Sequence, residues 1–152
     1  MKKYLKICLI IALFLVSLSG LGLHYKLHPL DKNLFGYVPF IAGLVSVLVI
    51  PTFFMFRKTL HLAYLLNGFM VILGVITMAH YTIVKTLILP DIFILLAKYF
   101  IGRVIFCIEV LPMNGEMKLS GWNWFRYPND GFFVVHAILL SVVYMLGNIL
   151  WR

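Results

Sequence analysis

Histidine is the residue type in this chain best suited to holding a metal or a haem. His24, His80 and His136 lie in three different apolar segments. An imidazole coordinates through one ring nitrogen and can fix its orientation through the other. Helix bundles commonly hold a b-type haem between two such rings. The sequence therefore predicts a haem b site, with His80 and His136 as the first-choice axial ligands and His24 as the next choice.

A zinc-type site is a second use of the same residue type. His24 and His28 are four residues apart and would share one face of a helix that continues past both. Further ligands could come from Asp31, Asp91 or Glu109. The alternative for all the histidines is a structural role near the membrane surface, with hydrogen bonds to backbone, water and lipid headgroups.

Three charged residues in the segment 87–112 form another candidate site. At 100° per residue Asp91, Lys98 and Glu109 fall within about 20° of one another, whereas Arg103 lies about 120° away. If buried in a membrane, this stripe would mark an ion or proton path. If placed at the interface, it would be the water-facing side of an amphipathic helix, which is the interpretation we favour.

Four long apolar segments must position these side chains. They predict transmembrane helices over about residues 5–23, 38–56, 62–84 and 131–151, because about 20 helical residues match the hydrocarbon thickness. Hydrophobic residues make up 63% of the chain, which places it in the membrane class. We expect one all-α membrane domain over residues 1–152. We also expect the first segment to be a retained helix, because its apolar run is longer than that of a usual signal peptide.

The segment at about residues 90–111 is ambiguous. It is long enough to cross a membrane but carries four charged residues. Central Lys and Arg cost about 2.5–3.5 kcal/mol each on insertion, and the surrounding Ile, Leu, Phe and Val residues nearly offset that cost. We predict four transmembrane helices plus one amphipathic interfacial or re-entrant helix, with five transmembrane helices as the alternative.

The basic residues predict the orientation. Lys2, Lys3 and Lys6 precede the first span, and Arg57 and Lys58 lie between the second and third. These positions favour a cytoplasmic N-terminus, as in a bacterial inner-membrane protein. The net charge of +8 is then explained by orientation and by anionic headgroups, and no nucleic-acid partner is expected. With four spans, four of the five histidines would gather near the outer face.

Small and polar residues within the spans predict close helix contacts. Ala42 and Ser46 have the small-xxx-small spacing, and so do Ala137 and Ser141. Asn67 lies in apolar surroundings and should find a hydrogen-bond partner, worth about 1 kcal/mol.

Four helices with histidines near one face form a layout that resembles the b-type cytochrome anchors of quinone-linked oxidoreductases. The resemblance implies a small integral subunit that anchors or couples a partner complex, with haem-mediated electron transfer to a quinone pool. The first alternative is a cofactor-free structural or assembly subunit, and the second is a small ion- or solute-conducting oligomer. Expected partners are the bilayer, a protein partner or further copies of the chain, and a quinone. No hydrolase, metalloprotease or P-loop motif occurs, so the chain is not expected to be an enzyme by itself but could be a subunit of a membrane oxidoreductase.

Overall fold

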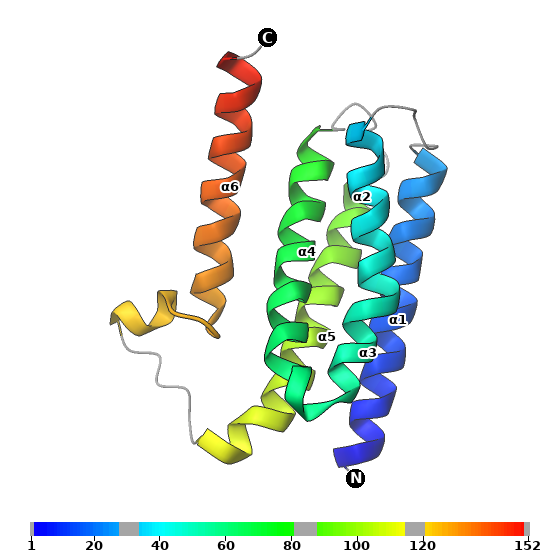
Figure 1. Ribbon diagram of the computed structural model, residues 1–152, viewed down its shortest axis with the longest axis vertical. Helices are drawn as coiled ribbons and strands as arrows, with labels where there is room; N and C mark the ends of the chain where they lie inside the picture. The colour runs from blue at the N-terminus through cyan, green and yellow to red at the C-terminus, as the bar shows by residue number, and fades with distance from the viewer. Residues whose placement is uncertain (1, 28–33, 81–87, 115–120, 151–152) are drawn as a thin grey trace.

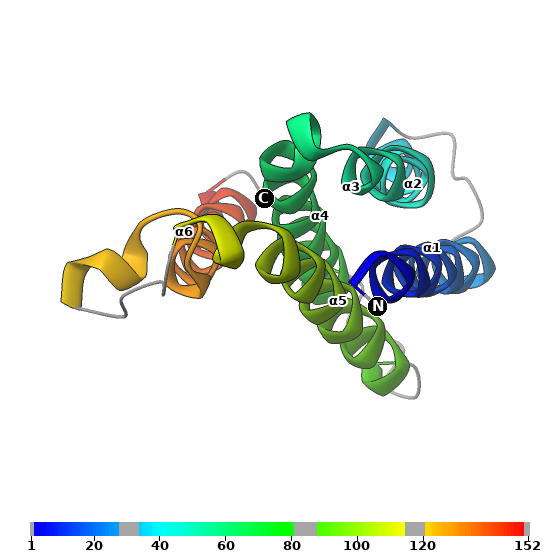
Figure 2. The ribbon, with the colours of Figure 1, turned by 90° about the horizontal axis from the view of Figure 1, so that it is seen from below.

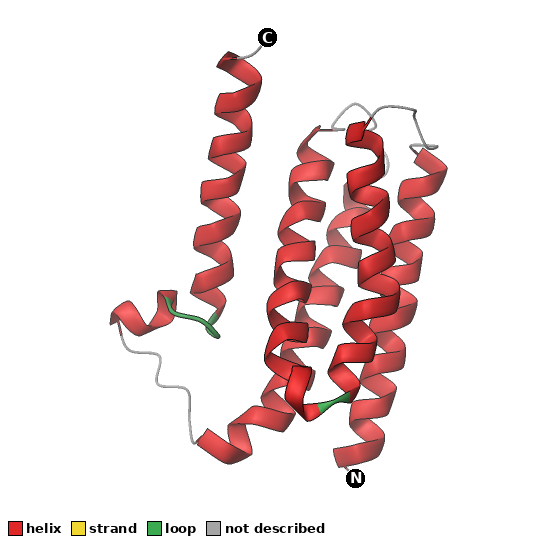
Figure 3. Cartoon of the chain, viewed as in Figure 1, coloured by secondary structure: helices red, strands yellow, loops and turns green. Residues whose placement is uncertain are grey.

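A computed structural model describes residues 2–27, 34–80, 88–114 and 121–150 of the chain. All the elements within these ranges are helical (Figure 3). The long helices are α1 (Lys2–Leu27), α4 (Leu60–His80), α5 (Ile88–Asn114) and α6 (Asp130–Leu150). Another long segment is built from α2 (Leu34–Leu44), the π-helix η1 (Val45–Val49) and α3 (Ile50–Met55). Two short 3-10 helices, η2 (Arg57–Thr59) and η4 (Gly121–Phe125), complete the set.

A bundle is formed by four segments that lie side by side: α1, α2–η1–α3, α4 and α5 (Figure 1). Helix α6 stands away from most of this bundle and contacts α4. Each of these segments runs in the direction opposite to the one before it. The N-terminus and η2 lie at the lower end of the bundle, and α6 begins beside its lower half (Figure 1). The upper end carries the last turn of α1 and the last turn of α4.

Four helical segments are long and apolar enough to cross a membrane. They are Lys2–Lys26, Tyr37–Met55, Arg57–Thr77 and Asp130–Gly147. They coincide with the four predicted spans, and their length and composition are compatible with an integral membrane protein. Apolar side chains cover much of their outer surfaces, as is typical of helices that face lipid.

Helix α5 is the segment for which the sequence favoured an interfacial or re-entrant placement. In the structure it lies lengthwise in the bundle, packed against both α1 and α4 (Figures 1 and 2). Its direction is opposite to that of α4, as for any two consecutive helices of the bundle. This placement turns the charged stripe of α5 towards its neighbours.

The second apolar segment changes its helical geometry near Pro51, where the sequence predicts a kink. Proline has no N–H and cannot continue the regular hydrogen-bond ladder. One turn before it the chain forms η1, in which the Ile50 N–H donates to the Val45 carbonyl. A π-turn of this kind changes which side chains face the bundle interior. Here it buries Ser46 and Val47.

The core lies at the middle and lower part of the bundle. Leu13, Ile50, Phe54 and Ile105 are fully buried there. Asn67 is also fully buried, and its Nδ2 donates to the Lys98 carbonyl oxygen at 3.1 Å. The predicted hydrogen-bond partner of Asn67 is therefore confirmed, and it joins α4 to α5.

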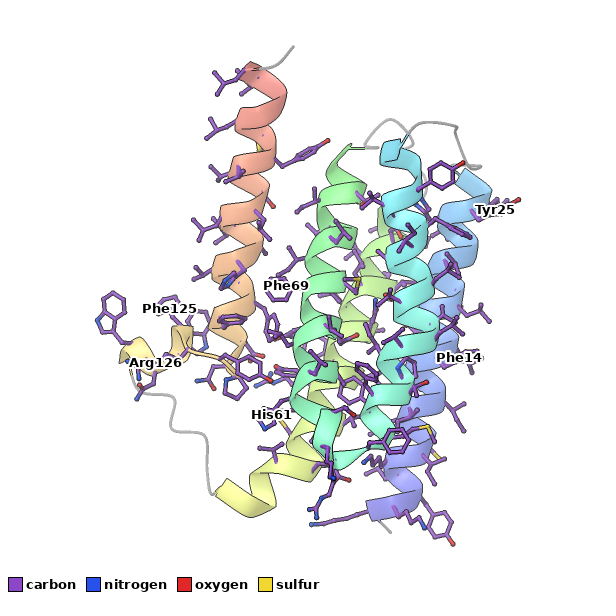
Figure 4. All side chains as sticks on the ribbon, in the orientation of Figure 1. Phe14, Tyr25, His61, Phe69, Phe125 and Arg126 are labelled. Carbon is purple, nitrogen blue, oxygen red and sulfur yellow. The ribbon has the colours of Figure 1, made fainter. Side chains whose placement is uncertain are left out.

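Helix α6 is held to the bundle through its lower half. Asp130 at its start accepts a hydrogen bond from Tyr99 at 2.8 Å and pairs with Arg103 at 2.8 Å. Just before it, the Tyr127 hydroxyl donates to the His61 carbonyl at 2.9 Å. Burial raises the pKa of Tyr127 to about 12, so this hydroxyl remains a donor at neutral pH. Further up, Phe69 of α4 lies between the two helices (Figure 4).

Candidate functional site in the upper half of the bundle

The charged stripe of α5 faces the interior of the bundle at Lys98. This side chain is 5% exposed, so the water-facing interpretation favoured by the sequence is wrong at this position. Asp91 and Lys98 line one cavity, whereas Glu109 pairs with Lys6 and Arg57 at the lower end. The structure therefore divides the stripe into two different sites.

The cavity lies between all four segments of the bundle and has a volume of about 110 Å³. Helix α1 contributes Ser17, Gly20, Leu21 and His24, and α2 with η1 contributes Pro39, Ala42, Gly43 and Ser46. Helix α4 contributes Met70, Leu73, Gly74 and Thr77, and α5 contributes Asp91, Ile94, Leu95 and Lys98. These residues come from the upper halves of α1, α4 and α5 and from the upper and middle parts of the segment α2–η1–α3, so most of the cavity lies in the upper half of the bundle.

Lys98 and two serines form the floor of the cavity. The Lys98 ammonium Nζ donates to the Ser46 hydroxyl at 2.5 Å. Ser17 is 4% exposed, and its hydroxyl has no hydrogen-bond partner among the described residues. No ion pair joins Lys98 to a carboxylate within the part of the chain that the structure describes. A buried amine with a neutral hydroxyl partner and an unpaired hydroxyl that lines the same cavity offer polar groups that can bind a further group.

His24 and Asp91 form the polar part of the cavity wall nearest the upper end. Asp91 lies seven residues before Lys98 on α5, which corresponds to about 10 Å along the helix. Thr77 also lines this part, but its hydroxyl donates to the Leu73 carbonyl at 2.8 Å. A ligand entering from the upper end would therefore pass an imidazole and a carboxylate before it reaches the amine.

Small residues make room for the cavity. Two walls of the cavity carry small residues where a large side chain would fill it: Gly20 on α1, and Ala42 and Gly43 on α2. A third wall, on α4, carries Gly74. A Cβ at Gly74 would come within 2.5 Å of the Leu95 side chain. The small-xxx-small pair Ala42 and Ser46 was expected to support close packing, and both members in fact face the cavity.

Below the floor, apolar packing closes the bundle. Leu13, Phe54 and Ile105 are fully buried, and Gly102 packs beside Asn67 and Phe54. Lys98 and Glu109 are eleven residues apart on α5, or about 16 Å along the helix. Apart from Asn67, the described core between them is apolar, so Lys98 and Glu109 are not joined by a continuous row of polar side chains among the described residues.

The first-choice haem ligands, His80 and His136, lie on two different helices, α4 and α6. The His136 ring packs against Phe69 at a centroid distance of 5.7 Å, and its Nδ1 lies 2.7 Å from the Phe132 carbonyl. His80 ends α4 eleven residues beyond Phe69, or about 16 Å along that helix. The described residues thus place the His136 ring beside Phe69, and a shared haem between His80 and His136 stays a prediction.

The remaining metal hypotheses gain no support from the described residues. His24 lies near the upper end, whereas His136 lies in the lower half of α6. His28 and Asp31 of the zinc hypothesis lie outside the described residues. Within the described ranges, no group of three or more His, Cys, Asp or Glu residues could hold a metal ion. Haem and zinc binding therefore stay predictions from the sequence.

Sequence reasoning missed Ser17 and the role of Ser46. Ser17 has no sequence motif, and the small-xxx-small spacing of Ser46 indicates helix packing and not a hydrogen bond to lysine. The available signal was Lys98 itself, because a lysine in an apolar segment must face either water or a polar neighbour. Which neighbour it meets depends on the π-turn at η1, which no spacing rule indicates.

No protein-family model, curated protein or solved structure matches this chain.

Proposed function

We propose that this chain is an integral membrane protein that binds a small anion in the upper half of its helix bundle. The observation that carries the proposal is the burial of Lys98 at the floor of a polar cavity, with a neutral hydroxyl as its partner. An ionisable residue inside a membrane is costly and usually functional. Asp91 lines the same cavity but lies about 10 Å from Lys98 along α5, and none of the described carboxylates forms an ion pair with Lys98. A bound anion would supply the opposite charge at the amine itself.

The size and lining of the cavity limit the ligand. A volume of about 110 Å³ has room for a group of a few heavy atoms, such as a small carboxylate or an inorganic anion. The Lys98 amine would bind the charge, and the Ser17 and Ser46 hydroxyls would donate hydrogen bonds to it. The apolar walls formed by Leu21, Leu73 and Leu95 would exclude competing water and so strengthen these interactions.

We further propose five membrane crossings, with the upper end outside. What supports this count is the position of α5, which lies lengthwise between α1 and α4. The charged residues of α5 have polar partners within the protein: Lys98 with Ser46, Arg103 with Asp130, and Glu109 with Lys6. Such pairing lowers the cost of inserting a charged helix. The basic residues at the lower end favour a cytoplasmic position for that end.

Conduction of ions by a single copy has less support than binding. The cavity lies in the upper half, and a buried apolar core separates it from Glu109. Among the described residues, a cavity confined to one part of the bundle suits binding better than passage across the membrane.

A subunit that anchors a partner complex is a second candidate function. It is favoured by α6, which attaches to the bundle through its lower half and exposes apolar residues along its length, such as Ile138, Val143 and Ile149. Lipid can cover this surface, but so can a helix of a protein partner. The two functions are compatible, since they use different parts of the molecule.

Thermal unfolding in the presence of small anions tests the binding function. The detergent-purified protein would be heated in sodium chloride, formate, acetate or phosphate, with ionic strength held constant by gluconate, which is too bulky for the cavity. At ten times the Kd of a bound anion, Tm should rise by about 3 °C or more. Lys98→Gln should abolish the rise.

Lys26→Gln is the matched control, because it removes one exposed charge near the upper end without touching the cavity. This variant should keep the full rise in Tm. The proposal fails if none of the four anions stabilises the protein relative to gluconate. It also fails if Lys98→Gln responds to the anions as strongly as the unsubstituted protein.

A further inference from the structure

A second cavity lies at the opposite end of the bundle, between α1 and the segment η1–α3. Its volume is about 740 Å³, far larger than that of the Lys98 site. One wall consists of α1 residues Ile7, Ile10, Ile11 and Phe14, and the other includes Val47, Leu48, Pro51 and Met55. Phe14 points outward from α1 in Figure 4. The cavity is therefore an apolar groove on the outside of the bundle, which we call the α1–α3 groove.

The lower rim of the α1–α3 groove is basic. Lys3, Lys6, Arg57 and Glu109 line it. Glu109 lies between two of the cations, 3.2 Å from Lys6 and 3.4 Å from Arg57. Three cations and one carboxylate leave two positive charges on the rim. Because Glu109 pairs with both Lys6 and Arg57, the structure holds these two cations in fixed positions on the rim.

The groove and its basic rim together fit within one leaflet of a bilayer. From Lys3 at the rim to Phe14, the α1 side of the groove rises through eleven residue steps, or about 16 Å, of which the apolar wall from Ile7 to Phe14 makes up about 10 Å. Half of a typical hydrocarbon core is about 15 Å. A lipid with its headgroup at the rim would therefore place the first part of its acyl chain along the apolar walls, within the same leaflet.

We infer that the α1–α3 groove binds one anionic phospholipid. Its phosphate would lie at the rim formed by Lys3, Lys6 and Arg57, and an acyl chain would lie between Ile11 and Leu48. Basic pockets between membrane helices commonly recognise anionic headgroups in this way. The net charge of the rim favours an anionic over a zwitterionic headgroup. This site is independent of the Lys98 cavity, so either proposal can fail without the other.

Native mass spectrometry of the detergent-purified chain tests the inference. Phosphatidylglycerol or phosphatidylcholine would be added at equal concentration, and the fraction of protein that retains one lipid would be measured. We expect retention of phosphatidylglycerol to exceed that of phosphatidylcholine. The double variant Lys6→Gln, Arg57→Gln should weaken phosphatidylglycerol binding roughly ten- to thirtyfold, the loss expected for two headgroup contacts.

The control double variant is Lys2→Gln, Lys58→Gln. It removes the same charge from the same end of the molecule, but neither residue lines the groove. It should lower phosphatidylglycerol binding by less than threefold. If both double variants lose binding equally, the lipid is attracted by general charge and the inference is wrong. Equal retention of the two lipids by the unsubstituted protein would also overturn it.

A second pair of variants leaves every charge in place. Ile11→Trp should fill the groove and reduce phosphatidylglycerol retention at least fivefold. Leu15→Trp is the control, because Leu15 is as exposed as Ile11 on α1 (54% and 53%) but does not line the groove. Equal binding by these two variants would overturn the inference. A dimer mass that Ile11→Trp abolishes, without any lipid preference, would instead assign the groove to a second copy of the chain.

Discussion

Single polar residues determine how tightly the helices of this bundle can approach each other. Asn67 is fully buried, and its amide joins α4 to the Lys98 carbonyl of α5. Gly102 lies one turn further along α5 and leaves the space that the Asn67 amide occupies. In a membrane, apolar side chains gain little by leaving lipid, so packing and hydrogen bonds of this kind carry helix association.

At this scale we predict that Gly102→Ala destabilises the protein. A Cβ at this position would lie too close to the Asn67 amide nitrogen, whereas its contact with Phe54 at 3.5 Å would be ordinary. The free energy of unfolding should fall by about 1–3 kcal/mol, the usual cost of overpacking a core. Circular dichroism during thermal or SDS-induced unfolding would measure it.

Gly22→Ala provides the comparison, since a Cβ at Gly22 meets nothing within 4 Å. This variant should be neutral or more stable by up to about 1 kcal/mol, because alanine favours helix more than glycine does. Equal stability of the two variants would contradict the proposed contact between Gly102 and Asn67.

At the scale of elements, α6 differs from the other long helices. It contacts α4, and its polar attachment to the bundle is concentrated around Asp130. That carboxylate receives the Tyr99 hydroxyl and the Arg103 guanidinium, both from α5. An acidic residue in the first turn also favours the helix itself, because it offsets the positive end of the helix dipole. Asp130 thus stabilises the first turn of α6 and also joins this helix to α5.

We predict that Asp130→Ala loosens α6 from the bundle. Loss of two charge-assisted hydrogen bonds should lower the free energy of attachment by about 2 kcal/mol. Limited trypsin digestion reports this change, because Arg126 is an exposed cleavage site in the segment that leads into α6. Cleavage after Arg126 should become several-fold faster in the variant.

Tyr99→Phe serves as the graded comparison for this experiment. It removes one hydrogen bond and keeps the ion pair between Arg103 and Asp130, so cleavage should increase less than in Asp130→Ala. Unchanged digestion of Asp130→Ala would mean that apolar contacts such as Phe69 with Phe133 hold α6 in place without the carboxylate.

For the whole molecule, the number of membrane crossings decides on which side of the membrane Arg126 lies. With five crossings, Arg126 and Lys58 share the cytoplasmic side, and Lys26 lies outside. With four crossings and an interfacial α5, Arg126 would lie outside together with Lys26. All three residues are exposed in the structure, so reagents can reach them once they are replaced by cysteine.

We predict the five-crossing result in a cysteine-accessibility experiment. The two native cysteines, Cys8 and Cys107, would first be replaced by alanine. A membrane-impermeant maleimide added outside intact cells should label Lys26→Cys but not Lys58→Cys or Arg126→Cys. Labelling of Arg126→Cys from outside, with Lys58→Cys protected, would instead support four crossings. Labelling of Lys58→Cys after lysis is the control for its reactivity.

The sequence alone predicts an all-helical chain with four segments apolar enough to cross a membrane, and the structure confirms the positions of these helices. Continuous apolar stretches of about 20 residues can form helices in lipid with every backbone group hydrogen-bonded internally, so four segments were predictable from composition and length. The need of Asn67 for a partner followed in the same way, because a buried amide without one is costly. These are local properties, which each segment carries whatever its neighbours are.

Only the tertiary structure decided which side chains meet. The sequence aligned Asp91, Lys98 and Glu109 on one face, but the neighbours of that face come from α1, η1 and η2. Those neighbours place Lys98 against Ser46 in a cavity and Glu109 against Lys6 and Arg57 in an ion-pair cluster. The neighbours of the histidines likewise depend on the tertiary structure, because His136 lies beside Phe69 and not beside the end of α4. Helical periodicity fixes the face on which a residue lies, whereas the direction and partners of the helix depend on contacts between segments far apart in the chain.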